Sequence, residues 1–265
     1  ATVAEALTAV GVTLHLGDPV QQVNGSGCIV TNNNTVECER VLVALGRQPN
    51  TEGMNLELAG VQVDEQGFIV SDAKLRTSNK KIFAAGDCAT RSQFTHHADA
   101  QARALIQNAL FFPTAKVDGL IVPHCTYTYP EVASVGLSED QLQATGTLYE
   151  AYEIYFDELD RIKAVPFADD FSRAAKGHAQ VFTAKGKDTI LGATIVGADA
   201  GELLAPICLL MTQNLGLSAA QRTIFSYPTR SEYLKRLGDA YNRGRMTPFV
   251  ARLFQRWMTF IKPRG

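Results

Sequence analysis

The stretch Lys80-Lys81-Ile82-Phe83-Ala84-Ala85-Gly86-Asp87 joins a short apolar strand to a tight turn that ends on a carboxylate. Gly86 has no Cβ, so a large ligand can approach its backbone closely. Asp87 is an ionised acceptor that can bind ligand hydroxyl groups. A helix is predicted to begin near Thr95, where its free N–H groups favour negative charge. Strand, glycine, acid and helix start together predict part of a dinucleotide-binding site.

The composition is that of an ordinary globular protein with room for about two domains. The chain has 265 residues, of which 46% are hydrophobic and 20% are charged. Its five cysteines show no CxxC or CxxxxC spacing, so the sequence offers neither a zinc knuckle nor a local redox disulfide. We therefore expect no metal site and a reducing, cytoplasmic location. No apolar run reaches the roughly 20 residues of a membrane span.

The first 118 residues are predicted to hold a meander, a buried strand and one long helix. Alternating apolar and polar residues with Asn-rich turns indicate antiparallel strands at 12–16, 20–23, 28–31 and 36–38. The continuous apolar run Arg40–Gly46 is typical of a strand buried on both faces. Phe68–Val70 predicts a further short strand. Thr95–Phe112 has helical spacing, with Thr95 as a plausible N-cap.

A change of composition at 113–123 predicts a domain boundary. Beyond it, periodicity predicts strands near Tyr127 and at 132–135, a helix from Ser138, a β-hairpin at 179–183 and 189–196, and an apolar helix at 199–211. The stretch around Phe156 and Val165 shows no clear pattern. Thr229 and Glu232 have capping-box spacing at the start of a final helix. This order of elements predicts an α+β fold.

Five stretches of the chain recur, in order, in one protein family. They are VLVALGRQPN (41–50), IFAAGD (82–87), YTYPEVASVG (127–136), LGATIVG (191–197) and YPT (227–229). The chain resembles the C-terminal portion of class I pyridine nucleotide-disulfide oxidoreductases, which include mercuric-reductase-like and dihydrolipoamide-dehydrogenase-like flavoproteins. The resemblance implies a homodimer with FAD as cofactor and NAD(P)H as co-substrate. Electrons would pass from nicotinamide to flavin to a cysteine pair.

The resemblance also implies an order of domains. Residues 1–46 would be the end of an NAD(P)-binding domain, and residues 47–118 the returning segment of an FAD-binding domain. Residues 119–245 would form the interface (dimerisation) domain, built from an antiparallel sheet and helices. Residues 246–265 would be a basic amphipathic tail.

The resemblance places cofactor contacts in the first half of the chain. In the family, the acid that matches Asp87 binds the ribityl chain of FAD, and the helix start that matches Thr95-His96-His97 faces the flavin ring. The cofactor-binding residues would be Gly46, Ala85, Gly86, Asp87, Thr95 and His96. The plainer alternatives are a turn-capping role for Asp87 and solvent-exposed positions for His96 and His97.

The resemblance places the catalytic candidates in the second half. In the disulfide reductases a His precedes Pro-Thr, pairs with a Glu, and acts as acid and base on the partner subunit's dithiol. Here that position is Tyr227, and Glu232 is the candidate to orient it. With an ordinary pKa of about 10, Tyr is a poor base near pH 7. The alternatives are a packed interface aromatic for Tyr227 and a helix-capping role for Glu232.

The chain departs from the family pattern in two further ways. It contains no GxGxxG phosphate turn and no CxxxxC redox pair. It also opens on ATVAEAL, which has the composition of a helix interior and lacks an initiator Met. We therefore expect the chain to be part of a longer enzyme. A dimerisation module without activity is the alternative hypothesis.

The tail combines apolar residues at three-to-four spacing with basic residues. From Arg230 to Gly265 there are nine Lys and Arg against two Asp and Glu. A basic amphipathic helix at 246–265 suits an anionic membrane surface, or it packs on the acidic body of the protein. Of these two interpretations we favour packing. No recognised nucleic-acid motif accompanies the charge, so nucleic-acid binding is not expected.

Overall fold

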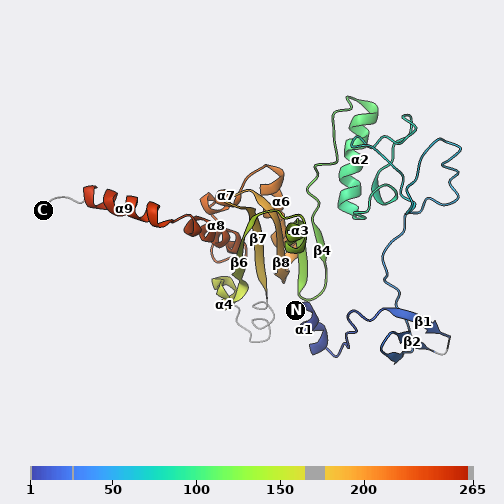
Figure 1. The fold of residues 1–265 in the computed structure, drawn as a ribbon, viewed down its shortest axis with the longest axis horizontal. Coiled ribbons are helices and arrows are strands. Elements are labelled where there is room, and N and C mark those ends of the chain that lie inside the picture. The colour runs from blue at the N-terminus through green and yellow to red at the C-terminus, as the bar shows by residue number, and fades with distance from the viewer. Residues whose placement is uncertain (1, 26, 165–176, 262–265) are drawn as a thin grey trace. The chain divides into compact units, whose positions relative to one another are not determined.

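The computed structural model describes residues 2–25, 27–164 and 177–261, and they form two compact units (Figure 1). One unit consists of residues 11–120. The other consists of residues 1–10 and 121–265. Helices and antiparallel sheets are both present, which confirms the predicted α+β class. Within the described ranges, no helix is both long enough and apolar enough to cross a membrane. Val165, Lys262 and Arg264 lie outside the described residues.

The unit of residues 11–120 begins with a small meander whose strands follow the order β1-β2-β3. Its antiparallel strands are β1 (Val20–Asn24), β2 (Cys28–Thr31) and β3 (Thr35–Glu37). Three of the four predicted strands are thereby confirmed, whereas residues 12–16 form no strand. The Asp18 carboxylate organises the β2–β3 turn, because it accepts hydrogen bonds from Thr31 Oγ1 at 2.6 Å and Asn34 Nδ2 at 2.7 Å. These bonds lower the pKa of Asp18.

The predicted buried strand at Arg40–Gly46 is not formed. The segment has no strand pairing, and Leu42 and Leu45 are 92% and 94% exposed. A strand buried on both faces needs neighbouring strands and covering layers. The one sheet described in this unit is the three-stranded meander, which does not include the segment. Phe68–Val70 likewise forms only an isolated bridge between Ile69 and Val63.

A long helix, α2 (Thr95–Leu110), follows the single-turn helix η1 (Gly86–Cys88). The predicted helix is therefore confirmed, but its N-cap is Phe94, which has no side-chain oxygen, rather than Thr95. Near its end the buried Asn108 side chain donates to Lys74 O at 3.1 Å and to Ala115 O at 2.9 Å. A small apolar cluster supports the turn before η1, formed by Val61, Ile69 and Ala84 with Leu56, Ile82, Cys88 and Ala89 packed against it.

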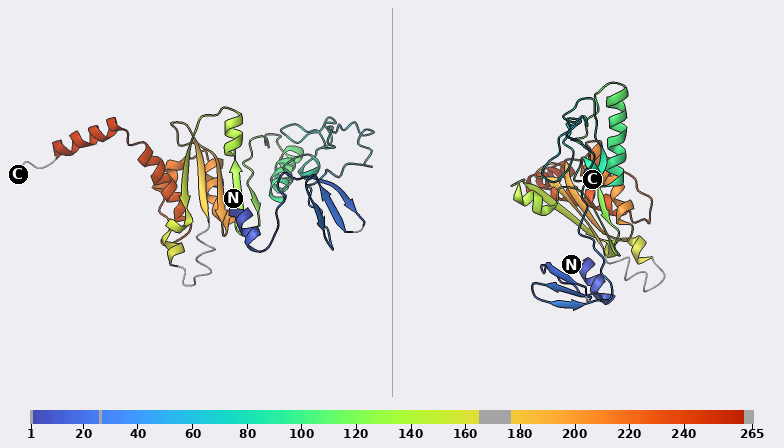
Figure 2. Two further views of the ribbon diagram at one scale, coloured as in Figure 1. Left: turned by 60° about the horizontal axis from the view of Figure 1, so that its bottom comes forward. Right: turned by 90° about the vertical axis from the view of Figure 1, so that its right-hand side faces the viewer.

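The second unit is built on a five-stranded antiparallel sheet in the order β4-β5-β8-β7-β6 (Figure 2). Its strands are β4 (His124–Thr126), β5 (Glu131–Gly136), β6 (Tyr149–Tyr155), β7 (His178–Ala184) and β8 (Ile190–Gly197). The predicted hairpin is the β7–β8 pair, in which Val181 faces Ala193. Strand β6 was not predicted. It is an edge strand whose glutamates interrupt the apolar pattern.

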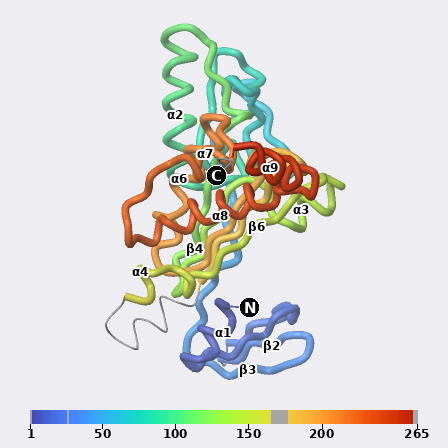
Figure 3. Tube along the Cα trace, turned by 90° about the vertical axis from the view of Figure 1, so that its left-hand side faces the viewer, coloured from blue at the N-terminus to red at the C-terminus, as the bar shows by residue number. Residues whose placement is uncertain are grey.

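Helices complete the core of this unit. Helix α6 (Ala200–Thr212) packs on β5 and β8, and α8 (Glu232–Gly244) packs on β6 and on α7 (Leu217–Arg222) (Figure 3). The other helices among the described residues are α1 (Thr2–Ala9), α3 (Glu139–Ala144), η2 (Phe156–Glu158), α4 (Asp160–Lys163) and α9 (Pro248–Ile261). Fully buried side chains fill the space between the layers, among them Val181, Ile195, Ile207, Leu217, Tyr233 and Leu237.

Local sequence signals predict one of two helix starts correctly. Helix α3 begins with a capping box in which Ser138 and Gln141 bond to each other's backbone N–H groups, as expected from a helix starting at Ser138. The predicted capping box of Thr229 and Glu232 is not formed. The Thr229 hydroxyl donates instead to Ser226 O at 2.7 Å, and α8 begins at Glu232.

A pair of facing glycines, Gly136 and Gly192, allows β5 and β8 to approach where α3 connects. A Cβ on Gly192 would lie 2.0 Å from Leu137 O, so the backbone would have to shift.

We expect Gly192→Ala to lower the free energy of unfolding by about 3 kcal/mol, because the added methyl group overpacks this site. Urea denaturation followed by circular dichroism measures this. Gly119→Ala is the control, since nothing lies within 4 Å of its added Cβ. Equal stability of the two variants would contradict the packing argument.

Candidate functional site

The turn at Gly86 is held against helix α2 by one short hydrogen bond. The Gly86 N–H donates to Gln101 Oε1 at 2.6 Å. Gly86 has a φ of +78°, which favours glycine, and a Cβ there would lie 3.3 Å from the Ala98 side chain. On the preceding side, Ala84 N–H donates to Leu75 O at 3.0 Å. The turn therefore has a fixed position on the helix.

A buried polar chain continues from this bond. Gln101 uses its oxygen for Gly86, so its Nε2 donates to His97 Nε2 at 3.1 Å. His97 Nδ1 then carries the proton and donates to Ser92 O at 3.1 Å. His97 is only 8% exposed, which contradicts the alternative of a solvent-exposed position and makes it a structural residue, whereas His96 is exposed, as that alternative predicts. Gln101 was not among the predicted site residues. Its four-residue spacing from His97 on a helix was the available signal.

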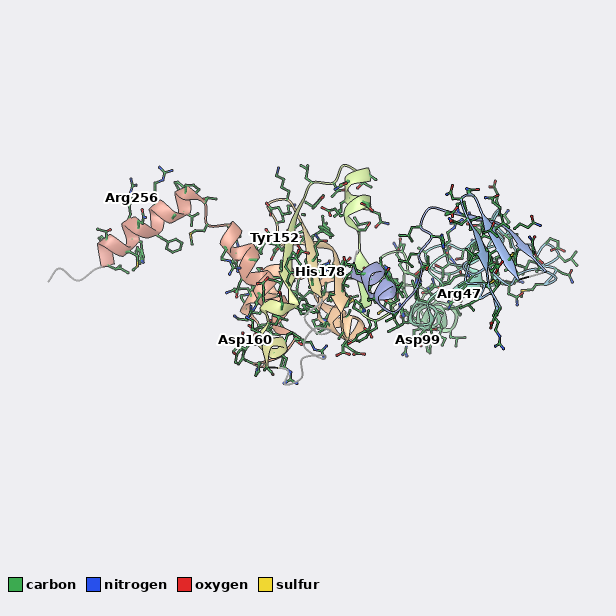
Figure 4. All side chains as sticks on the ribbon, turned by 90° about the horizontal axis from the view of Figure 1, so that it is seen from below. Arg47, Asp99, Tyr152, Asp160, His178 and Arg256 are labelled. Carbon is green, nitrogen blue, oxygen red and sulfur yellow. The ribbon has the colours of Figure 1, made fainter. Side chains whose placement is uncertain are left out.

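The carboxylate of Asp87 lies at the surface beside Arg47 (Arg47 is labelled in Figure 4). Its side chain is 50% exposed, and its oxygen is 3.9 Å from Arg47 Nη1. Arg47 Nη1 also donates to Gln93 O at 2.6 Å, and Gln93 Nε2 donates to the Asp87 carbonyl at 3.3 Å. The structure therefore brings together Asp87 and the segment that follows Gly46. The long ion pair leaves the carboxylate able to accept further hydrogen bonds.

The remaining cofactor candidates lie at or near the start of α2. Thr95 is the first helical residue, and the His96 ring stacks on the Phe94 ring at a centroid distance of 5.3 Å. The first turn contains no acidic residue, so its N–H groups and the helix dipole favour a negative group. Ala85 precedes the turn glycine and is half-buried. Gly46 is exposed, with a φ of +112°.

In the other unit, Tyr227 is held by an acid that lies 67 residues away in the sequence (Asp160 is labelled in Figure 4). The Tyr227 hydroxyl donates to Asp160 Oδ2 at 2.8 Å. The other Asp160 oxygen is 3.8 Å from Lys163 Nζ. Sequence reasoning missed Asp160, because nothing near Tyr227 in the sequence points to it.

Glu232 does not bond to Tyr227. Its Oε1 accepts from Arg236 Nε at 3.0 Å, and Arg236 Nη1 donates to Glu158 O at 2.9 Å. Its Oε2 is buried and has no hydrogen-bond partner among the described residues. The carboxylate acts on Tyr227 only through its negative charge.

The chemistry available at Tyr227 follows from its hydrogen bond. The bond to Asp160, followed by the charge of Asp160, raises the pKa of Tyr227 above its ordinary value, because the phenolate would face a carboxylate. Near pH 7 the side chain is therefore a neutral O–H donor. Because its one proton is donated to Asp160, the hydroxyl oxygen can accept a hydrogen bond from a further partner, but it does not act as a base.

The cysteines of this chain do not form a disulfide pair. All five cysteines are free. Burial raises the pKa of Cys125 and of Cys208, so both remain protonated near neutral pH. Within the parts of the chain that the structure describes, no group of His, Cys, Asp and Glu side chains could hold a metal ion.

We expect Asp160→Asn to lower the pKa of Tyr227, because the substitution removes the negative charge that disfavours the phenolate. Ultraviolet titration of tyrosine ionisation measures this, with the Tyr227 contribution obtained by subtracting the Tyr227→Phe curve. Asp157→Asn is the control, since it removes an acid three residues before Asp160, whereas Tyr227 bonds to Asp160. An unchanged Tyr227 titration in Asp160→Asn would show that the hydrogen bond is not formed in solution.

Comparison with known proteins covers most of the chain. Residues 1–102 match the family model "Pyridine nucleotide-disulphide oxidoreductase", and residues 122–237 match its "dimerisation domain" model. A mitochondrial dihydrolipoyl dehydrogenase of Dictyostelium discoideum is 33% identical over 84% of this chain and 44% of its own length. A mercuric reductase of Staphylococcus aureus is 32% identical over 87% of this chain and 42% of its own length. The chain thus spans about half the length of these relatives.

Solved structures show the same fold. LpdA of Mycobacterium tuberculosis superposes with a TM-score of 0.80 at 24% identity, over 91% of this chain and 53% of that one. The HOCl-induced flavoprotein disulfide reductase RclA of Escherichia coli gives 0.78 at 24% identity, over 90% and 54%. Together with the family models, these matches confirm the resemblance inferred from the five sequence stretches. The chain belongs to the class I pyridine nucleotide-disulfide oxidoreductase family and includes its dimerisation domain.

Proposed function

We propose that this chain supplies the dimerisation domain and part of the FAD site of an NAD(P)H-dependent flavoprotein disulfide oxidoreductase. The observation that carries the proposal is the Gly86–Asp87 turn, fixed on α2 by the bond between Gly86 and Gln101. Family membership supports it, because family members are FAD-dependent and use NAD(P)H.

The residues of the turn fit FAD. Gly86 is buried against α2 and fixes the turn, and the half-exposed Asp87 carboxylate can accept hydrogen bonds from ribityl hydroxyl groups. The first turn of α2, from Thr95, would stabilise negative charge on the isoalloxazine ring. Bound FAD would supply the transfer of reducing equivalents from nicotinamide to a cysteine pair. The chain's own part is to hold the cofactor and to favour its reduced, negatively charged form.

The second contribution of the chain would be made at a dimer interface. We propose that the neutral Tyr227 hydroxyl, whose one proton is donated to Asp160, accepts a hydrogen bond from the reacting group bound by the partner subunit. Asp160 would position the hydroxyl, since it accepts from it at 2.8 Å. The full activity also needs a GxGxxG phosphate turn and a CxxxxC pair, neither of which occurs in these 265 residues. The terminal electron acceptor and the choice of NADH or NADPH would depend on the rest of the enzyme.

The segment around Tyr227 has the surface expected of an interface. Ile224 is 97% exposed and Tyr227 is 70% exposed, three residues apart. Large apolar side chains that are this exposed are typical of protein–protein contact sites when they cluster. We therefore place the homodimer contact of this chain at segment 224–228.

The FAD assignment predicts a specific role for Asp87. The test uses a chimera in which this chain follows the N-terminal half of the dihydrolipoyl dehydrogenase of Dictyostelium discoideum. We expect Asp87→Ala to weaken FAD binding by roughly tenfold or more, because FAD loses its hydrogen bonds to a charged acceptor. The flavin-to-protein absorbance ratio after gel filtration measures this.

Asp99→Ala is the matched control. It removes an exposed acid of α2 that pairs with Arg103 (Asp99 is labelled in Figure 4). If Asp87→Ala retains as much FAD as Asp99→Ala, the assignment of Asp87 is wrong. If neither the parent chimera nor its variants bind FAD, the proposed cofactor site is wrong.

The dimer assignment predicts the mass of the chain in solution. We expect analytical ultracentrifugation at micromolar concentration to give twice the 28.8 kDa chain mass. Ile224→Asp should raise the dimer dissociation constant roughly tenfold or more, because it places a charge in an apolar contact. Leu58→Asp, at an 83% exposed residue of the other unit, should leave the dimer unchanged. A monomeric parent chain would exclude the proposed interface.

A further inference from the structure

Helix α9 (Pro248–Ile261) has a broad apolar face that no other part of the described structure buries. None of its residues is buried. Its large apolar side chains are between 49% and 82% exposed, and they are Phe249, Leu253, Phe254, Trp257, Met258, Phe260 and Ile261. The packed tail favoured by the sequence is therefore not what the structure shows. A helix that is exposed on such a face needs an apolar environment from elsewhere.

The two faces of α9 are sharply divided. At 100° per residue, the large apolar side chains from Phe249 to Ile261 fall within one half of the helix circumference. The opposite half holds Arg252, Gln255, Arg256 and Thr259. Two side-chain hydrogen bonds of this half stay within the helix. Arg252 Nε donates to Pro248 O at 3.1 Å, and Thr259 Oγ1 donates to Gln255 O at 2.8 Å.

The charges of the tail have one sign. Residues 246–265 contain no Asp or Glu, and their charged side chains are Arg252, Arg256, Lys262 and Arg264. Both charged residues of α9 are arginines, at neighbouring positions of the polar face. Their long apolar stems let the guanidinium groups reach water or lipid headgroups while the helix lies at a membrane surface. This charge pattern complements an anionic surface.

The length of α9 shows that the helix would lie on a bilayer rather than span it. Fourteen residues make a helix of about 21 Å, which is shorter than the roughly 30 Å of a bilayer's hydrocarbon core. A divided helix with Arg on one face and Trp, Phe and Leu on the other suits the boundary between headgroups and acyl chains. A self-associating helix would not need the one-sided positive charge.

We propose that α9 is a peripheral membrane-binding helix that lies flat on an anionic lipid surface. Its apolar face enters the acyl boundary, and Arg252 and Arg256 contact lipid phosphate groups. The proposal does not depend on the cofactor assignment. Its consequence is that the flavoprotein would work beside a membrane, where a membrane-bound or lipid-soluble partner can meet it.

The chain carries its own reporter for this contact, because Trp257 is its one tryptophan and lies in the apolar face. The 265-residue chain is titrated with vesicles of phosphatidylcholine containing phosphatidylglycerol, and with vesicles of phosphatidylcholine alone. We expect tryptophan emission to shift to shorter wavelength with the anionic vesicles. The titration midpoint should lie at a much higher lipid concentration for the zwitterionic vesicles.

Matched variants separate the two components of binding while keeping Trp257. Arg252→Gln with Arg256→Gln should weaken binding to anionic vesicles roughly 25-fold, about fivefold for each charge near the surface. Leu253→Gln with Phe260→Gln should weaken binding at least tenfold to both kinds of vesicle, because apolar burial is lost. Gln255→Ala with Thr259→Ala, on the polar face, should bind within about twofold of the parent chain. Circular dichroism checks that each variant keeps its fold.

Three results would overturn the proposal. The first is an emission spectrum that does not change with anionic vesicles. The second is equal binding to both vesicle types. The third is a shift without lipid that grows with protein concentration and follows the oligomeric state, which would assign the apolar face to a second copy of the chain.

Discussion

The hydrogen bond from Gly86 N–H to Gln101 Oε1 is the interaction on which the proposed cofactor site depends. At 2.6 Å it fixes a turn with positive φ onto α2. Gln101 is held in turn by His97, whose ring is anchored on Ser92 O. Because each donor and acceptor in this buried chain has a partner, the turn is rigid. Asp87 therefore has a defined position next to the start of the helix before any ligand binds.

In the dimerisation domain, too, a hydrogen bond between residues distant in the sequence fixes a candidate site residue. Its sheet and helices form a dense core, and an exposed tyrosine is held at the surface by a distant acid. The bond between Tyr227 and Asp160 keeps the phenol protonated and uses its one proton, so Tyr227 is a neutral phenol near pH 7. Glu232 is engaged by Arg236 and cannot orient Tyr227 directly. Replacement of a basic imidazole by a neutral phenol changes the chemistry that the interface can perform.

Local patterns predicted the elements that depend on local interactions. Helix α2, helix α6 and the β7–β8 hairpin follow from periodicity and turn residues, and the family followed from five ordered stretches. The failures involve partners that are distant in sequence. Arg40–Gly46 is apolar enough for a strand but has no neighbouring strands to pair with. Gln101 and Asp160 acquire their roles from residues 15 and 67 positions away. An amphipathic pattern predicted α9, but it could not identify what covers its apolar face.

We propose that the Gly86–Asp87 turn and the start of α2 form one FAD-binding surface. Nuclear magnetic resonance of the nitrogen-15-labelled chimera with the N-terminal half of the Dictyostelium discoideum relative, titrated with FAD, tests this directly, because each backbone amide reports separately. We expect the amides of Gly86, Asp87 and Thr95 to shift most, with amides of the β7–β8 hairpin unchanged. Shifts confined to other regions, or no saturable shifts at any amide, would contradict it.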